Sequence, residues 1–115
     1  MLKVIRTNFD RREQRRDRRY AVPPIVVTIG QSEYTTLDWS LGGFLLSTGL
    51  DFIIGEQIEG ELRFASQVEG YPFTAEAVRR DDEPRATAFR FVERTDAMVT
   101  ALDRAIVGRL TRRPS

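Results

Sequence analysis

The sequence contains neither cysteine nor histidine, and Lys3 is its only lysine. Without cysteine, the chain can form neither a disulfide framework nor a thiolate metal site. Without histidine, it lacks the commonest general base and metal ligand, so Ser-His-Asp and Cys-His catalytic arrangements are impossible. An enzyme would have to rely on carboxylates, tyrosine or this single lysine. We expect a protein that is not an enzyme, with no metal site and no cofactor.

Long apolar runs are also absent. No stretch approaches the roughly 20 apolar residues that span a bilayer, and the N-terminal residues Met1–Arg6 lack the apolar core of a signal peptide. We therefore expect no membrane span and a cytoplasmic location. Hydrophobic residues make up 41% of the 115 residues, which is enough for one domain with a modest core.

Positive charge is concentrated at the N-terminus. Residues 1–20 carry eight basic and three acidic side chains, whereas residues 21–115 carry ten basic and fourteen acidic ones. Six arginines lie within residues 11–19, and the arginine fork matches phosphates and base edges. A solvated tail is one interpretation of such a run. Nucleic-acid binding is another, but the rest of the chain is acidic and shows no basic groove with interleaved aromatics, so we expect no nucleic-acid partner.

The pattern after the arginines is mostly that of short strands. β-Branched and alternating apolar residues, separated by glycine-containing and polar turns, favour six strands. We predict these strands at residues 25–29, 33–37, 43–47, 57–64, 73–78 and 86–92. Residues 38–42 are predicted to be a loop, and Asp81-Asp82-Glu83-Pro84 a polar turn rather than a metal site.

A helix is predicted at the C-terminal end of the chain. Thr95 is a suitable N-cap, with Asp96 in the first turn, and Arg112-Arg113-Pro114 should end the helix. Apolar residues recur on one stripe at i, i+4 spacing, namely Met98, Leu102, Ile106 and Leu110. The fold class is therefore mainly β: a small antiparallel barrel or sandwich, with the helix closing one end. Residues 1–21 are predicted to be a flexible arm, and residues 22–112 the folded domain.

Two motifs carry a resemblance to a known family. Arg15-Arg16-Asp17-Arg18-Arg19-Tyr20 resembles the RxxxR motif that opens PilZ domains, and Asp38-Trp39-Ser40-Leu41-Gly42-Gly43 resembles their second motif, [D/N]xSxxG. The two motifs occur in order around a predicted strand hairpin, and the resemblance covers about residues 14–112. It implies a six-stranded antiparallel PilZ-type β-barrel that binds the bacterial second messenger cyclic di-GMP.

The resemblance also implies which residues bind the ligand. Other pairs within the arginine run satisfy RxxxR, and we choose the pair whose second arginine directly precedes the first predicted strand. The expected cyclic di-GMP-binding residues are Arg15, Arg19, Asp38, Ser40 and Gly43. Possible secondary contacts are Arg16, Arg18, Trp39, Gly42 and Arg79, the last being our first choice among the arginines near the final predicted hairpin.

The chemistry of these residue types fits that ligand. Guanine O6 and N7 accept a bidentate arginine, which is worth about 1–3 kcal/mol of discrimination, and phosphates pair with guanidinium groups. Asp38 can accept hydrogen bonds from guanine N1–H and N2–H, and Gly43 permits close backbone approach. Two alternatives remain open: Asp38 and Ser40 could form a self-bonded turn, and Trp39 could pack in the barrel rather than stack on a base.

The expected function is a bacterial receptor for cyclic di-GMP. Ligand binding would order the arm and so pass the signal to an unidentified protein partner. The alternative is a PilZ-fold interaction module that binds no nucleotide. The sequence leaves open the regulated process, the ligand stoichiometry and the oligomeric state.

Overall fold

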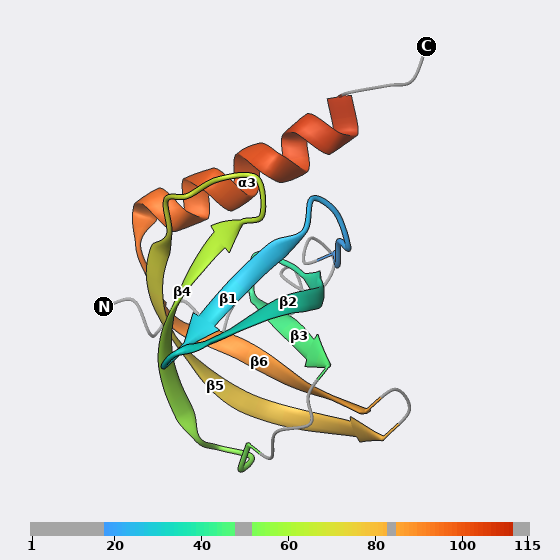
Figure 1. The fold of residues 1–115 in the computed structure, drawn as a ribbon. Coiled ribbons are helices and arrows are strands. Elements are labelled where there is room, and N and C mark those ends of the chain that lie inside the picture. Colours follow the sequence, from blue (N-terminus) through green and yellow to red (C-terminus); the bar gives the residue numbers. More distant parts are fainter. Residues whose placement is uncertain (1–17, 48–51, 83–84, 112–115) are drawn as a thin grey trace, which may run out of the picture.

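Six strands and one helix make up the part of the chain that the computed structural model describes, which is residues 18–47, 52–82 and 85–111. The strands form a closed antiparallel barrel in the order β1-β2-β3-β6-β5-β4 (Figure 1). Their bounds are β1 Ile25–Ile29, β2 Ser32–Trp39, β3 Gly43–Ser47, β4 Gln57–Phe64, β5 Tyr71–Asp82 and β6 Arg85–Arg94. The predicted mainly β fold and its six-stranded antiparallel barrel are thus confirmed.

The alternation of side chains explains why these strands close on themselves. Along β5, Phe73, Ala75 and Ala77 are buried, while the residues between them face outward. The ring of Phe44 on β3 lies at the centre of an aromatic cluster and stacks on Phe89, 5.1 Å between centroids. Each large side chain buried in this way stabilises the fold by about 1.5–3 kcal/mol.

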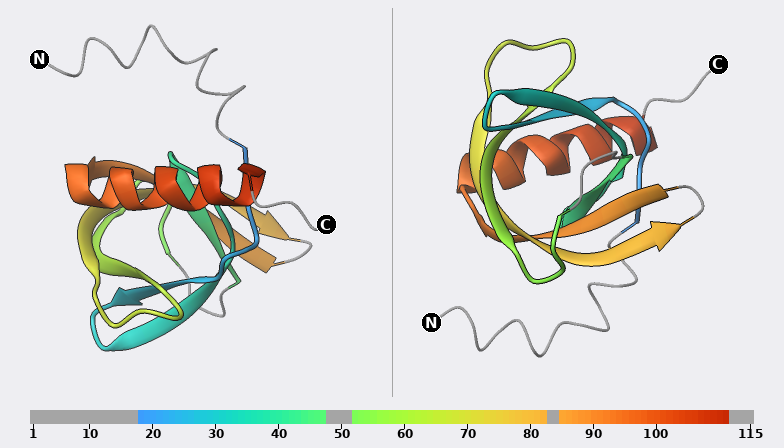
Figure 2. Two further views of the ribbon diagram at one scale, coloured as in Figure 1. Left: turned by 90° about the horizontal axis from the view of Figure 1, so that it is seen from above. Right: turned by 60° about the horizontal axis from the view of Figure 1, so that its bottom comes forward.

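The helix α3 (Asp96–Thr111) lies across one end of the barrel (Figures 1 and 2). Thr95 is its N-cap, as predicted, because the Met98 N–H donates to Thr95 Oγ1 at 3.1 Å. Met98, Leu102 and Ile106 belong to the same buried cluster as the barrel strands. Among the described residues, no helix is long and apolar enough to cross a membrane.

Three strands are longer than predicted: β2 is Ser32–Trp39 rather than 33–37, β5 is Tyr71–Asp82 rather than 73–78, and β6 is Arg85–Arg94 rather than 86–92. Two of these extensions change predicted turns. The loop predicted over residues 38–42 comprises only Ser40–Gly42, because β2 continues to Trp39 after a bulge between Thr36 and Asp38. The predicted polar turn contains two strand residues, since Asp81 and Asp82 pair with β6. In both places cross-strand pairing outweighs the low strand propensity of aspartate.

Several predictions fall outside the described residues. They are the predicted arm up to residue 17, the tip of the last turn at residues 83–84, and the helix end at residues 112–115.

Candidate functional site

The C-terminal end of the arginine run lies against β2. The Tyr20 N–H donates to the Trp39 carbonyl oxygen at 2.8 Å, and the Trp39 N–H donates to the Tyr20 carbonyl oxygen at 2.9 Å. This edge of β2 is accessible because the pairing of β1 with β2 reaches only from Ile29 to Val26. The rings of Tyr20 and Trp39 also contact each other, with centroids 5.4 Å apart. The two backbone hydrogen bonds between Tyr20 and Trp39 fix where the chain leaves the barrel and place Arg19 beside Asp38.

Arg19 and Asp38 form an ion pair that joins the two sequence motifs. Arg19 Nη1 lies 2.8 Å from Asp38 Oδ1, and the side chains are 45% and 27% exposed. An ion pair this exposed stabilises a fold by only about 0–1 kcal/mol, so both groups can exchange this partner for a ligand at low cost. Arg18 is exposed beside them, whereas Arg15 and Arg16 lie outside the described residues.

Ser40 shapes the loop that follows Asp38. Its side chain is buried, with 1% of the residue exposed, and its Oγ accepts from the Gly42 N–H at 3.1 Å. The Ser40 N–H donates to the Gly43 carbonyl oxygen at 2.8 Å. The structure therefore shows the self-bonded turn, one of the two sequence interpretations, for Ser40, while Asp38 instead pairs with Arg19.

The same loop is held to β6 and to the end of the barrel. The Phe91 N–H donates to the Gly42 carbonyl oxygen at 2.9 Å, and the Arg94 guanidinium donates to the Leu41 carbonyl oxygen. Gly42 is thus a backbone acceptor within the loop. These bonds fix the loop conformation that carries Asp38 at its N-terminal side.

Gly43 is required by the packing of β3 on β6. A Cβ atom at this position would lie 2.0 Å from the carbonyl oxygen of Phe89, far inside van der Waals contact. Gly43 is buried and pairs with Arg90. The close backbone approach predicted for Gly43 is therefore an approach to a neighbouring strand.

Trp39 is a core residue in this structure. The indole is fully buried, its Nε1 donates to the Pro23 carbonyl oxygen at 2.9 Å, and its ring meets Phe64 edge-on at 6.3 Å. This burial agrees with the packing interpretation of Trp39, and in this conformation no face of the indole is open for stacking.

Cross-strand pairing from β2 through β3 and β6 to β5 places Asp38 and Arg79 on the same outer side of the barrel. Asp38 pairs with Leu45 on β3, Leu45 pairs with Ala88 on β6, and Ala88 pairs with Arg79 on β5. Directly paired residues in a sheet point to the same side. We call the surface made of Arg19, Asp38, Leu45, Ala88 and Arg79 the motif face. Between its two charged rims the floor is apolar, with Leu45 partly exposed and Ala88 buried at 3% exposure.

Arg79 is held by a neighbour that sequence reasoning missed. Its Nε lies 2.9 Å from Asp81 Oδ1, and its Nη2 lies 3.2 Å from Asp81 Oδ2. The hydrogen bonds to Asp81 raise the pKa of Arg79, and the nearby charge of Asp38 adds to this effect. The same hydrogen bonds lower the pKa of Asp81, and the charge of Arg19 contributes. Four charged groups from three segments thus form one electrostatic cluster.

Sequence signals for these missed residues exist, but they are weak. Asp81 follows Arg79 at a spacing of two, which places both on one face of a strand, yet residues 81–84 were predicted to be a turn. Leu45 and Ala88 have no distinctive chemistry, and only the register of β3 and β6 identifies them as the floor of the motif face.

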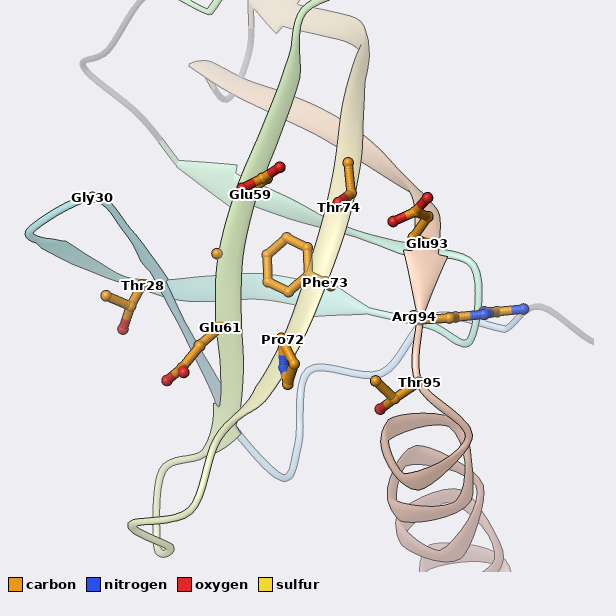
Figure 3. A pocket seen from close by; sticks show the side chains of 11 residues that line it. Thr28, Gly30, Glu59, Glu61, Pro72, Phe73, Thr74, Glu93, Arg94 and Thr95 are labelled. Carbon is orange, nitrogen blue, oxygen red and sulfur yellow. The ribbon is translucent and has the colours of Figure 1, made fainter.

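A groove of about 950 Å³ lies elsewhere on the barrel, lined chiefly by residues of β4 and β5. No residue of the motif face lines it. Its charged residues are Glu59, Glu61, Glu93 and Arg94, and Figure 3 shows Arg94 extending away from the others. Three carboxylates would repel a phosphate, so the motif face suits an anionic ligand better than this groove.

Comparisons with known proteins agree with this geometry. The sequence profile of the PilZ domain family matches residues 10–108. Among solved structures, the Bacillus subtilis inhibitor of motility (MotI/DgrA) is similar, with a TM-score of 0.66 and 23% identity over 83% of this chain. YcgR from Escherichia coli, solved in complex with c-di-GMP, has a TM-score of 0.62 and 24% identity over 86% of this chain.

Both similarities cover part of the larger proteins. The chain spans 50% of MotI/DgrA and 46% of YcgR. At these identities the two structures support the fold of this chain and not its activity. No match was found among the curated proteins.

Proposed function

We propose that this chain, which belongs to the PilZ domain family, is a receptor for c-di-GMP that binds its ligand on the motif face. The observation that carries the proposal is the Arg19–Asp38 pair, at 2.8 Å. It unites the arginine motif with the DxSxxG motif at one edge of an apolar floor. A structural neighbour, YcgR, was solved with c-di-GMP.

The groups on the motif face match the parts of this ligand. Asp38 can accept hydrogen bonds from guanine N1–H and N2–H, and an arginine can donate to O6 and N7. Leu45, which is partly exposed, offers an apolar surface for the face of a base, and the buried Ala88 packs beside it. A complex with a micromolar dissociation constant needs about −8 kcal/mol. Arginine–phosphate hydrogen bonds of about 1.5–3 kcal/mol each, together with base reading, are sufficient for it.

Arg15, Arg16 and Arg18 are assigned to the phosphates in this proposal. Arg18 is exposed and directly precedes Arg19, so it needs only a side-chain rotation to reach an anion near the ion pair. Binding exchanges the Arg19–Asp38 contact for contacts with the ligand, and the arginine segment is then fixed across the motif face. The free energy of ordering this segment is subtracted from the contact energy.

Ser40, Gly42 and Gly43 support binding through the loop. Their hydrogen bonds and close packing hold the strand end that carries Asp38, so their replacement acts on the position of this carboxylate. Trp39 has the same role, because it fastens β2 to Tyr20 and Pro23. The signal then reaches a protein partner through the changed position of the arginine segment.

Isothermal titration calorimetry with c-di-GMP tests the proposal and gives affinity and stoichiometry together. We expect a dissociation constant of about 1 μM or lower for the parent protein. Arg19→Ala should weaken binding at least tenfold, because a charge-assisted contact is lost. Arg63→Ala is the matched control, since Arg63 forms an exposed ion pair with Glu33 on β4 and β2, away from the motif face. It should leave the affinity within about twofold.

Two results would contradict the proposal. One is the absence of binding at about 100 μM c-di-GMP, which would favour an interaction module that binds no nucleotide. The other is an equal loss of affinity in the Arg19→Ala and Arg63→Ala variants, which would place the ligand elsewhere or show only an effect of net charge.

A further inference from the structure

The rim of the motif face on β5 is an arginine of which one bidentate fork, Nε with Nη2, is already occupied. Arg79 makes two parallel hydrogen bonds to the carboxylate of Asp81, from Nε at 2.9 Å and from Nη2 at 3.2 Å. This bidentate geometry is the one by which arginine also binds a phosphate or the Hoogsteen edge of guanine. Arg79 therefore cannot offer this fork to a ligand while Asp81 holds it.

The two rims of the motif face repeat one arrangement. Each pairs one arginine with one aspartate, Arg19 with Asp38 and Arg79 with Asp81. Beside the hydrogen bonds between Arg79 and Asp81, the charge of Asp38 contributes to the raised pKa of Arg79, and the charge of Arg19 contributes to the lowered pKa of Asp81. The four groups carry no net charge. On the motif face, therefore, both arginines that could bind a dianionic ligand are already paired with aspartates of the same chain.

We propose that Asp81 is an internal competitor of the ligand, which holds Arg79 away from c-di-GMP until the ligand displaces it. The inference rests on the proposed function, because it concerns the same face. On one rim, Asp38 pairs with Arg19 and is also assigned to guanine binding. On the other rim, Asp81 pairs with Arg79 and belongs to neither of the two sequence motifs. Its carboxylate lowers the affinity of the site, so the threshold concentration of messenger is set partly by this residue.

The position of Asp81 on β5 makes the competition specific. Arg79 and Asp81 are two residues apart on one strand, so their side chains emerge on the same face. Asp82 is the next residue, points to the other face, and is exposed. Asp82→Asn therefore changes the charge of the hairpin by the same amount as Asp81→Asn, but it leaves the hydrogen bonds between Arg79 and Asp81 in place.

Calorimetry with c-di-GMP on three proteins tests the inference. Asp81→Asn should bind about five to ten times more tightly than the parent, because Arg79 is released from an exposed ion pair and one like charge leaves the vicinity of the phosphates. Asp81→Ser, which removes both carboxylate oxygens, should show a similar gain. Asp82→Asn should stay within about twofold of the parent.

A double-mutant cycle separates release of Arg79 from general charge repulsion. In an Arg79→Ala background, Asp81→Asn should gain less than about twofold. A gain that persists in full there would overturn the inference, and so would an unchanged affinity of Asp81→Asn in the parent background. If neither the parent nor Asp81→Asn binds c-di-GMP, the proposed function fails and the inference fails with it. If the parent binds and Asp81→Asn gains nothing, only the inference fails.

Discussion

Gly43 provides the sharpest test of how the second motif works, because the structure gives it a role in the barrel. A Cβ atom at residue 43 would lie 2.0 Å from the Phe89 carbonyl oxygen and 3.1 Å from Arg90 Cα. Both atoms are backbone, so no side-chain rotation can relieve the contact. Gly43→Ala must instead push β3 away from β6 by an ångström or more.

The cost of this separation can be worked out from its parts. Overpacking in a closed core costs about 1–3 kcal/mol. The shift also strains the hydrogen bond from the Phe91 N–H to the Gly42 carbonyl oxygen, now 2.9 Å, and a net loss there adds about 1 kcal/mol. We therefore expect Gly43→Ala to lower the free energy of unfolding by about 2–4 kcal/mol, and the melting temperature by about 10 °C or more.

Urea and thermal unfolding, followed by circular dichroism, measure this effect. Gly108→Ala is the matched control, because the same added methyl group meets nothing within 4 Å and residue 108 lies within α3. Alanine is favoured over glycine in a helix, so this variant should gain about 0.5–1 kcal/mol. If Gly43→Ala unfolds like the parent yet loses c-di-GMP, the reasoning is refuted and Gly43 serves the ligand directly.

Three further predictions concern base reading, motif register and the anchoring of the arm. Cyclic di-AMP should bind at least tenfold more weakly than c-di-GMP, because adenine lacks O6 and the N1–H and N2–H donors; Asp38→Ala should narrow this gap in calorimetry, and an unchanged gap would exclude base reading by this residue. Arg15→Ala and Arg19→Ala should each weaken c-di-GMP binding at least tenfold and Arg11→Ala less than about twofold; a loss of binding in Arg11→Ala with none in Arg19→Ala would move the RxxxR motif by four residues, to Arg11 and Arg15. Trp39→Phe should lower the free energy of unfolding by about 1–3 kcal/mol in urea, because the Pro23 carbonyl oxygen loses its donor, and an unchanged midpoint would contradict this role.

Periodicity predicted most of the fold. Strand β5 shows the reason: its buried residues Phe73, Ala75 and Ala77 alternate with outward residues, and this period of two is visible in the sequence. The helix was equally clear from its N-cap Thr95 and its apolar stripe. These local signals required no knowledge of which strands pair.

Bulges and strand extensions were not predictable from local signals. The bulge between Thr36 and Asp38 shifts the register by one residue and so keeps Trp39 inside and Asp38 outside. The sequence interpretation placed both residues in a loop, because it had no measure of cross-strand pairing. Asp81 was assigned to a turn for the same reason, and its partnership with Arg79 was missed.

The site was predictable where residue chemistry is distinctive. The resemblance to the two PilZ motifs implied Asp38 and Arg19, and the structure places these two residues in contact. The roles of Ser40 and Trp39 depend on burial, which in turn depends on the barrel that surrounds them. The floor residues Leu45 and Ala88 became visible only from the pairing of β3 with β6, and Arg15 remains a prediction because it lies outside the described residues.

The closed order of the strands limits how this domain can contact another protein. In the barrel β1-β2-β3-β6-β5-β4 every described strand has a neighbour on both sides, and the edge of β2 at Trp39 is taken by Tyr20. Where the strands close on one another, a partner therefore finds no free row of backbone groups at which to add a strand of its own. The end of the β5–β6 hairpin differs, because β4 pairs with β5 only from Tyr71 to Glu76 while β5 continues to Asp82. Over the closed part of the barrel, recognition depends on side chains, loops or α3, so changes in surface charge and shape can reach a partner while the barrel itself stays unchanged.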